Sequence, residues 1–434
     1  MFNILKIAVR NLARFGRRTL LTSSLITLGI VGVLLFIAVS GSFKTIMIGQ
    51  FTDSMLGHLE VHRRGYVASI DSLPLNLNMK ATMVGKVEQV LGQMDVVESY
   101  SERIKLGAMF SNFTETTSMR VNGVDPAKEI ATMPLLPGRL IGEKRAGPLL
   151  KSGEMLIPEL IARGMKVKVG DTVVLVATNR DGSVNGKTFT VGGVLQSVSG
   201  PSGKDGYITI DDARSLLRMK EAEVSEFAIR LKSPAQLDAV YQQLSKELSA
   251  IAGGAGGGAG AGSGDKQPTA GKGGGSGGLE VHTWADLSPF SSIVRMIDLL
   301  AVFIKVMMVS IVLISVMNVM MMAVYERIRE IGTISAIGTP PGRILALFIT
   351  EGLLLGLGGA ALGTAISLAA IYALNIWKVT VHFGMQQAIL LSPAVAAMDI
   401  VTIVAMVVIM ALLASLQPAW KASRMDPVTA LGHV

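Results

Sequence analysis

The chain of 434 residues contains no cysteine. It can therefore form no disulfide, and both thiol catalysis and metal ligation by cysteine are excluded. An exported domain of this composition must be held together by its own apolar core, which about 200 ordered residues are able to supply.

Two catalytic sequence patterns are also missing. The segment from Asp181 to Thr188 ends in Gly-Lys-Thr, but a phosphate-binding loop needs glycine where Asp181 stands, and a helix after the loop. Strand-like residues flank this segment, so hairpin turns are the better interpretation. His58 and His62 have no H-E-x-x-H pattern and no third ligand nearby, and we interpret them as surface histidines. We predict no enzyme activity, cofactor or metal site in this chain.

Apolar residues are abundant and gathered in blocks. They make up 50% of the chain, whose mean hydropathy is +0.50. A membrane span needs ~20 predominantly apolar residues. Four segments meet this condition, and we predict transmembrane helices at 19–39, 306–324, 344–374 and 394–416.

The distribution of Lys and Arg predicts the orientation of these spans. Basic residues cluster before the first span, between the second and third, and after the fourth. Short basic flanks remain in the cytoplasm, so the residues between the first two spans are exported.

Alternating and helical apolar patterns mix in the exported part, which predicts an α+β domain. The other predicted segments are an interfacial amphipathic helix (1–18), stalk helices (40–56 and 279–305), the extracytoplasmic domain (57–251), a flexible glycine-rich loop (252–278), a cytoplasmic coupling segment (325–343), an extracytoplasmic loop (375–393) and a cytoplasmic tail (417–434).

A dense cluster of charge lies between the second and third spans. Glu326, Arg327, Arg329 and Glu330 place four charges within five residues. A chain does not need such a cluster merely to turn back into the membrane, whereas a surface that grips a second protein does. Pro340 and Pro341 follow, and because proline disrupts a helix they predict a sharp, stiff turn into the third span.

This cluster is part of a longer pattern, Tyr-Glu-Arg-Ile-Arg-Glu-Ile-Gly, that begins at Tyr325. Together with Glu351 and the Pro418-Ala419 ending, it resembles the coupling region of MacB/FtsX-type ABC transporter permeases. Looser matches, such as Val121-Asn122-Gly123-Val124-Asp125-Pro126, are similar to the MacB-type periplasmic core domain. The residues that the resemblance assigns to ATPase coupling are Glu326, Arg327, Arg329, Glu330, Ile331, Gly332, Ala336, Gly338 and Glu351.

The resemblance implies a membrane α-helical fold with four transmembrane helices, long stalk helices and one extracytoplasmic α+β domain. It also implies a bacterial cytoplasmic (inner) membrane protein with its large domain in the periplasm. A separate cytoplasmic ABC ATPase would carry ATP and Mg, and a second permease copy or a paralogue would complete the complex. The chain is also expected to contact membrane lipids, and no nucleic-acid partner is expected.

The cargo is open at this point. Lipoprotein release, as in LolC/LolE-like relatives, is the preferred prediction, since the entry Gly57–His62 resembles theirs. One alternative is MacB-like efflux of peptide, macrolide or lipid with a periplasmic adaptor. Another is an FtsX-like mechanical regulator of a cell-wall hydrolase.

Two further features of the third span carry predictions. Glu351 is expected to anchor the turn against Arg327, Arg329 or Arg343. Small residues at spacing four let helix backbones approach closely, either within one subunit or between two. The glycines with this spacing are Gly352, Gly356, Gly359 and Gly363.

Overall fold

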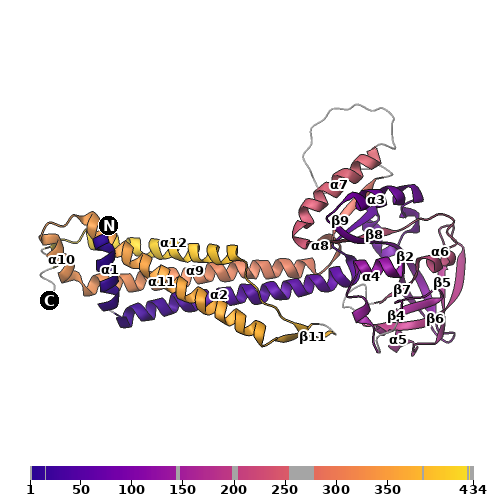
Figure 1. Cartoon of the computed structure of the whole chain (residues 1–434), viewed down its shortest axis with the longest axis horizontal. Helices are drawn as coiled ribbons and strands as arrows, with labels where there is room; N and C mark the ends of the chain where they lie inside the picture. The colour runs from indigo at the N-terminus through magenta and orange to yellow at the C-terminus, as the bar shows by residue number, and fades with distance from the viewer. Residues whose placement is uncertain are drawn as a thin grey trace. The chain divides into compact units, whose positions relative to one another are not determined.

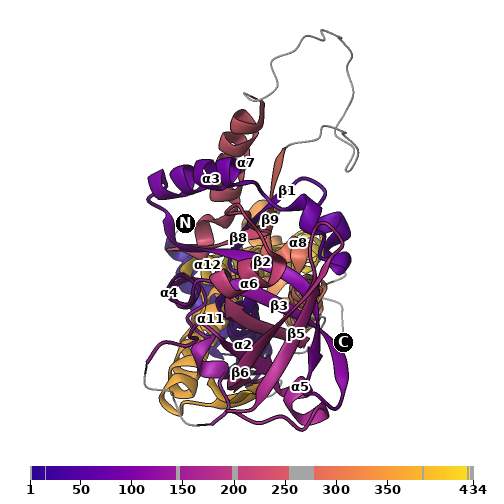
Figure 2. The ribbon, with the colours of Figure 1, turned by 90° about the vertical axis from the view of Figure 1, so that its right-hand side faces the viewer.

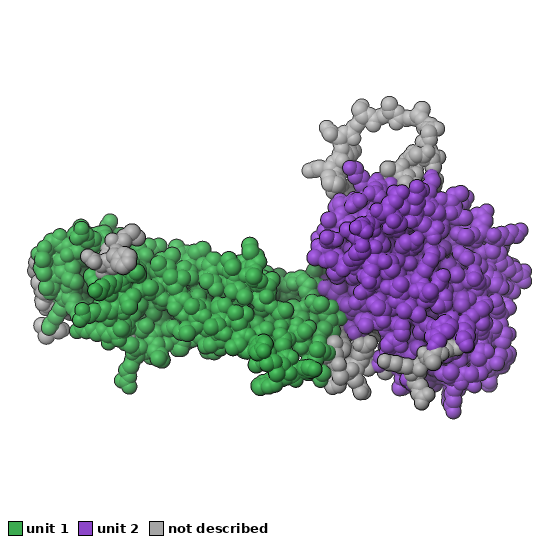
Figure 3. Space-filling view, viewed as in Figure 1, with its two compact units in different colours: residues 1–46, 293–381, 388–434 green, residues 47–292, 382–387 purple. Residues whose placement is uncertain are grey.

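The computed structural model describes residues 2–14, 16–142, 147–197, 204–253, 278–383, 386–427 and 430. They form two compact units, coloured separately in Figure 3. Unit 1 comprises Met1–Ile46, Ile293–Val381 and Ala388–Val434, and unit 2 comprises Met47–Ser292 and His382–Gln387. The predicted glycine-rich loop 252–278 lies almost wholly outside the described residues.

Unit 1 is helical, and its long helices can be followed in Figure 1. Four helices are long and apolar enough to cross a membrane. Three predicted spans fall within one of them, and the fourth, 394–416, begins three residues before its helix. The predicted membrane fold is thereby confirmed. These helices are α2 (Gly16–Phe51), α9 (Ser291–Glu326), α11 (Pro341–Ile376) and α12 (Ala397–Ser423).

Close packing around α11 depends on its glycines. A Cβ atom added at Gly352 would lie 2.6 Å from the Ser415 Cβ atom of α12. One added at Gly359 would lie 2.6 Å from Ile26 Cγ2 of α2. Both distances are shorter than side-chain carbons tolerate, so only glycine allows these helices to approach. Gly356 and Gly363 meet Ala411 of α12 and Ile30 of α2 in the same way, which places all four glycines at contacts within one chain.

Two short helices lie at the ends of the long ones. Helix α1 (Phe2–Arg14) precedes α2, and α10 (Ile328–Ala336) connects α9 to α11. The predicted helix 1–18 is therefore too long, because α2 already begins at Gly16. The predicted loop 375–393 is not without structure, since β10 (Thr380–Phe383) and β11 (Gln386–Leu390) pair within it.

Unit 2 is built on a nine-stranded sheet, several strands of which are labelled in Figure 2. Strands β2, β3, β7, β4, β6 and β5 pair in a closed ring, because β3 bonds both to β7 and back to β2. Strands β8, β1 and β9 extend the sheet from the other end of β2. The bounds are β1 (Leu59–Arg63), β2 (Val97–Ser111), β3 (Thr116–Val124), β4 (Glu154–Pro158), β5 (Thr172–Thr178), β6 (Val184–Leu195), β7 (Asp205–Thr209), β8 (Glu226–Leu231) and β9 (Leu279–Thr283).

The 15-residue strand β2 joins the two parts of the sheet. Its first half pairs with β8, and its second half pairs with β3 and β5. Alternate apolar residues such as Ile104, Leu106 and Phe110 are buried in the core. Five helices accompany the sheet: α3 (Ala81–Gln93), α4 (Pro126–Thr132), α5 (Glu159–Gly164), α6 (Ile210–Leu217) and α7 (Leu237–Gly253).

The predicted stalk helix 279–305 is wrong over its first part. Leu279–Thr283 forms strand β9, and α8 (Trp284–Leu287) separates it from α9. Leu279 and Val281 alternate with polar residues, and both side chains are buried where β9 pairs with β1. This burial favours the strand over a continued helix. The first predicted stalk holds, since α2 continues to Phe51 and is followed by a π-helical turn, η1 (Thr52–Leu56).

Candidate coupling site and the clamp of unit 2

The charged turn forms a short helix of its own. Helix α10 ends at Ala336, and Gly338 takes a φ of +93°, a left-handed conformation that glycine adopts without strain. Pro341 then occupies the first position of α11, where a missing N–H costs no hydrogen bond. The two prolines therefore begin α11 and fix the direction of the turn.

A buried ion pair anchors this turn. Arg327 Nη1 donates to Glu351 Oε1 at 2.9 Å, and Asn11 Nδ2 of α1 donates to the same oxygen at 2.8 Å. Glu351 is only 2% exposed and Arg327 only 7% exposed. Of the three arginines considered from the sequence as partners of Glu351, Arg327 forms an ion pair with it.

An apolar contact supports the same face of α10. Ile331 and Gly332 are buried, and Ile331 packs in a cluster drawn from α9, α11 and α12. Ala419 and Ala422 of the C-terminal Pro-Ala motif belong to this cluster. The two motifs recognised at distant places in the sequence therefore meet at one small core.

The other side of this turn is exposed. Glu326 at the end of α9, Arg329, Glu330 and Ala336 in α10, and Gly338 after it are all exposed, and the Glu330 carboxylate lies 3.5 Å from the Arg14 guanidinium. The predicted coupling residues thus divide into two groups. The exposed group is the five residues just named, and the buried, anchoring group is Arg327, Ile331, Gly332 and Glu351.

Sequence reasoning missed two apolar residues on this exposed side. Ile334 is 41% exposed and Ile337 is 80% exposed, and the neighbours of Ile334 in the chain are the polar residues Thr333 and Ser335. Large exposed apolar side chains rimmed by polar residues are typical of protein contacts. The signal that could have identified them is the pair of isoleucines three residues apart within a turn.

Unit 2 contains a second arrangement that sequence reasoning missed. The turn η1 follows α2, and arginines from the sheet region hold it. Arg103 Nη1 donates to the Met55 carbonyl at 2.7 Å, and Arg139 Nη1 donates to the Ser54 carbonyl at 3.1 Å. Arg230 Nη1 donates to Asp53 Oδ1 at 2.6 Å. Carbonyls at a helix C-terminus lack internal donors, so these arginines satisfy and fix them. We call Arg103, Arg139 and Arg230 the arginine clamp.

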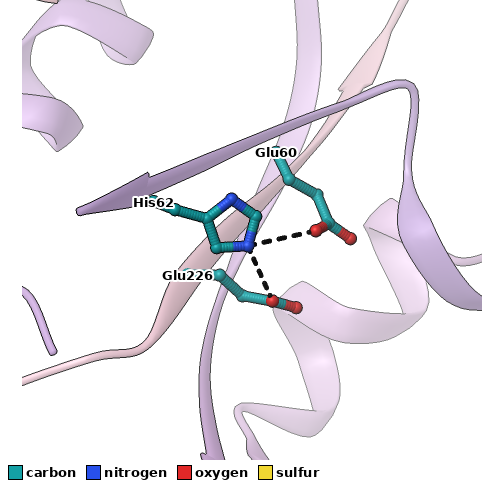
Figure 4. Close-up of side chains that lie close together, drawn as sticks. All are labelled: Glu60, His62 and Glu226. Carbon is teal, nitrogen blue, oxygen red and sulfur yellow. Dashed lines mark hydrogen bonds and ion pairs between the residues drawn. The ribbon is translucent and has the colours of Figure 1, made fainter. Parts of the chain in front are cut away.

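Arg103 also belongs to a buried network of charge. Its guanidinium contacts both oxygens of Glu129 and reaches Glu226 Oε1 at 3.2 Å. His62 Nε2 lies 3.2 Å from Glu226 Oε2 and 3.3 Å from Glu60 Oε2, as Figure 4 shows. The prediction that His58 and His62 are surface residues is wrong, since they are 5% and 0% exposed. The reason is that β1 is an inner strand between β8 and β9.

The network determines the charge of its members. Burial disfavours a charged imidazole, but hydrogen bonds to Glu226 and Glu60 outweigh it and raise the pKa of His62 to about 8. Burial likewise opposes a charged Glu226, yet the Lys105 ammonium 2.7 Å away, together with His62 and Arg103, holds the pKa of Glu226 well below its usual range.

Glu60, His62 and Glu226 each offer one possible metal-ligand atom, and these atoms lie within 4.8 Å of one another. However, the surrounding charges already balance. Arg103, Lys105 and protonated His62 face the carboxylates of Glu60, Glu129 and Glu226. A divalent cation would have to displace this balance, so the arrangement favours an ion-pair network over a metal centre.

Two models of known protein families match this chain. A family model for the MacB-like periplasmic core domain matches residues 19–247, and one for the FtsX-like permease C-terminal region matches residues 302–427. The chain belongs to the MacB/FtsX family of ABC transporter permeases. The first match includes η1 and the arginine clamp of this permease, and the second includes α10 and Glu351.

Similar proteins match over shorter stretches. The pyoverdine export protein PvdT of Pseudomonas savastanoi pv. phaseolicola is 39% identical over 118 residues, which are 27% of this chain and 16% of that protein. The macrolide export protein MacB of Chromobacterium violaceum is 32% identical over 143 residues, 32% of this chain and 20% of that protein. The periplasmic region of MacB from Actinobacillus actinomycetemcomitans superposes with a TM-score of 0.34 at 10% identity, over 55% of this chain and 92% of that one.

Proposed function

We propose that this permease receives ATP-driven motion from a separate cytoplasmic ABC ATPase at α10 and transmits it to unit 2 for export. Two copies, or one copy and a paralogue, would work with two ATPases in the bacterial inner membrane. The observation that carries the proposal is that the turn built around α10 has a buried side and an exposed side. The buried side is fixed by the ion pair Arg327–Glu351, and the exposed side presents Ile334 and Ile337.

A turn that transmits force needs both sides. The buried side prevents α10 from moving independently of α11, because Arg327 and Asn11 both donate to the same Glu351 oxygen. The exposed side supplies apolar area at Ile334 and Ile337, and Glu330, one helical turn before Ile334, supplies charge. Charge pairs across an interface can couple by ~1.5–7 kcal/mol, which suits a contact under load.

The receiving end of this proposal is the arginine clamp. The first stalk helix ends at η1, and its last carbonyls are hydrogen-bonded to Arg103 and Arg139 of unit 2. A displacement of the helix end would therefore move the sheet with it. Because both arginines are buried, water cannot replace these bonds easily.

For the cargo, the comparisons support export more than lipoprotein release. Two similar proteins are named as exporters, one of pyoverdine and one of macrolides, although the matched stretch is 16% of the first and 20% of the second. We therefore propose efflux as the function, with lipoprotein release as the alternative carried by the Gly57–His62 resemblance. Regulation of a cell-wall hydrolase is not favoured by any of these relatives.

The test is to place a photo-crosslinking amino acid at Ile337 in the native host. The proposal expects the crosslinked partner, identified by mass spectrometry, to be an ABC ATPase. A second arm replaces Ile337 with glutamate, and separately Glu330 with arginine, in an affinity-tagged chain. Each change is expected to remove at least about nine tenths of the copurifying Mg-ATPase activity, because a single central contact can contribute ~2 kcal/mol or more to an interface.

The matched control is Leu160→Glu, which changes an apolar residue that is 56% exposed in α5 of unit 2. This variant is expected to retain the ATPase fully. Wild-type ATPase recovery in Ile337→Glu, or crosslinks only to lipid, would remove the docking assignment.

A further inference from the structure

Unit 2 encloses a cavity of about 410 Å³ beside η1. Part of its wall is apolar and includes Phe51, Met55, Leu73 and Phe290. The Phe51 and Phe290 rings stack there with centroids 4.2 Å apart. A cavity of this size lies within the range of small-molecule sites, which are mostly apolar with a few polar groups.

The polar part of the wall contains two carboxylates that each have a buried oxygen without a donor. Glu60 is 1% exposed, and its Oε1 accepts no hydrogen bond from the described residues. Its Oε2 lies 3.3 Å from His62 Nε2, which it shares with Glu226. Asp205 Oδ1 is also buried without a hydrogen-bond partner. Buried polar atoms are normally satisfied, so both groups point to a donor that the described residues do not provide.

The basic side chains around these carboxylates are held elsewhere. Lys105 contacts Glu226 at 2.7 Å, and Arg120 contacts Asp71 at 3.4 Å. Arg139, which also faces Asp205, donates to the Ser54 and Gln196 carbonyls. A ligand that brings its own positive donor would complete Glu60 and Asp205 without disturbing these contacts.

We propose that this cavity binds a small organic ammonium ion with an aromatic or aliphatic body. The ammonium group would donate to Glu60 and Asp205, and the body would lie against Phe51, Met55 and Phe290. The ligand would then contact both η1 and the residues that lead into α9, so its binding would stiffen this junction. The site belongs to unit 2 alone and does not depend on the proposed docking of an ATPase.

Equilibrium dialysis of the full chain in lipid nanodiscs tests the proposal with three matched probes. Tryptamine carries the ammonium, tryptophol is its neutral alcohol, and indole-3-propionate is its anionic counterpart. Tryptamine is expected to bind about tenfold more tightly than tryptophol, because a charge-assisted hydrogen bond is the stronger one. Indole-3-propionate is expected to bind more weakly than either, and empty nanodiscs measure partition into lipid.

Variants then locate the bound probe. Glu60→Gln and Asp205→Asn are each expected to weaken tryptamine binding about tenfold while tryptophol binding stays unchanged. Asp95→Asn, which changes a fully exposed acid of the same unit, is the control and should bind as the wild type does. An unfolding temperature for each variant shows that it folds. Equal binding of tryptamine and tryptophol, uptake no greater than that of empty nanodiscs, or wild-type tryptamine binding in both cavity variants would overturn the proposal.

Discussion

Replacing Arg327 with methionine tests whether the buried ion pair holds the charged turn in place. The change removes the guanidinium that donates to Glu351 at 2.9 Å and leaves a carboxylate that is 2% exposed. Removing one partner of a buried pair costs about 3–5 kcal/mol. Because Asn11 still donates to the same oxygen, we expect a loss at the lower end, about 3 kcal/mol in the free energy of unfolding.

The assay is unfolding of the purified chain in mixed micelles as the fraction of SDS rises, followed by helical circular dichroism. Arg343→Met is the control, since Arg343 is exposed near the same turn and should change stability by less than about 0.5 kcal/mol. In the double variant Arg327→Met/Glu351→Met no charge is left unpaired, so most of the loss should be recovered. If Arg327→Met behaves like Arg343→Met, or the double variant is as unstable as the single one, the anchoring role is refuted.

Three further predictions concern packing, pH and topology. Gly359→Ala should destabilise unit 1 by about 1–3 kcal/mol because its new methyl group would overlap α2, whereas Gly358→Ala, with no atom within 4 Å, should not; SDS unfolding compares them. The folded-state pKa of His62 is raised to about 8 from 6.5, so its ~2 kcal/mol of stabilisation is fully present below pH 6.5 and lost as the pH rises through 8. Unfolding temperatures measured from pH 6 to 9 should show this loss in the wild type, and His62→Gln should flatten it. Because the chain has no cysteine, Asp181→Cys should react with an impermeant thiol reagent in outer-membrane-permeabilised cells and Ile337→Cys should not; the reverse pattern would invert the topology.

Features encoded locally could be predicted from the sequence. The four spans are visible as long runs with almost no charge, and each coincides with a long helix except for the first three residues of the fourth span. The pattern around Arg327 and Glu351 identified the family and included the pair that forms the buried contact. In each case the physical cause, apolar length or a dense local motif, lies within a few dozen neighbouring residues.

Features that depend on distant residues could not be predicted. His62 appeared to lack a ligand because its partner Glu226 is 164 positions away and is brought near by the pairing of β1 with β8. The clamp joins Ser54 to Arg139, 85 positions apart, for the same reason. The predicted stalk helix included the residues of β9 because they directly precede the helical apolar pattern that begins at Trp284. The pairing of β9 with β1 is what makes these residues a strand. Sheet register is set by long-range pairing, which a single sequence does not display.

The central claim, that motion at α10 reaches unit 2, is tested most directly by hydrogen exchange in the purified complex of this chain with its ATPase. The measurement compares the peptide covering Thr52–Leu56 with and without ATP trapped by vanadate. We predict a change in its exchange rate of at least about threefold, because moving the helix end strains the bonds from Arg103 and Arg139, and local opening sets exchange. The same peptide should not respond in Ile337→Glu. Identical exchange with and without trapped ATP in the wild-type complex would contradict the account.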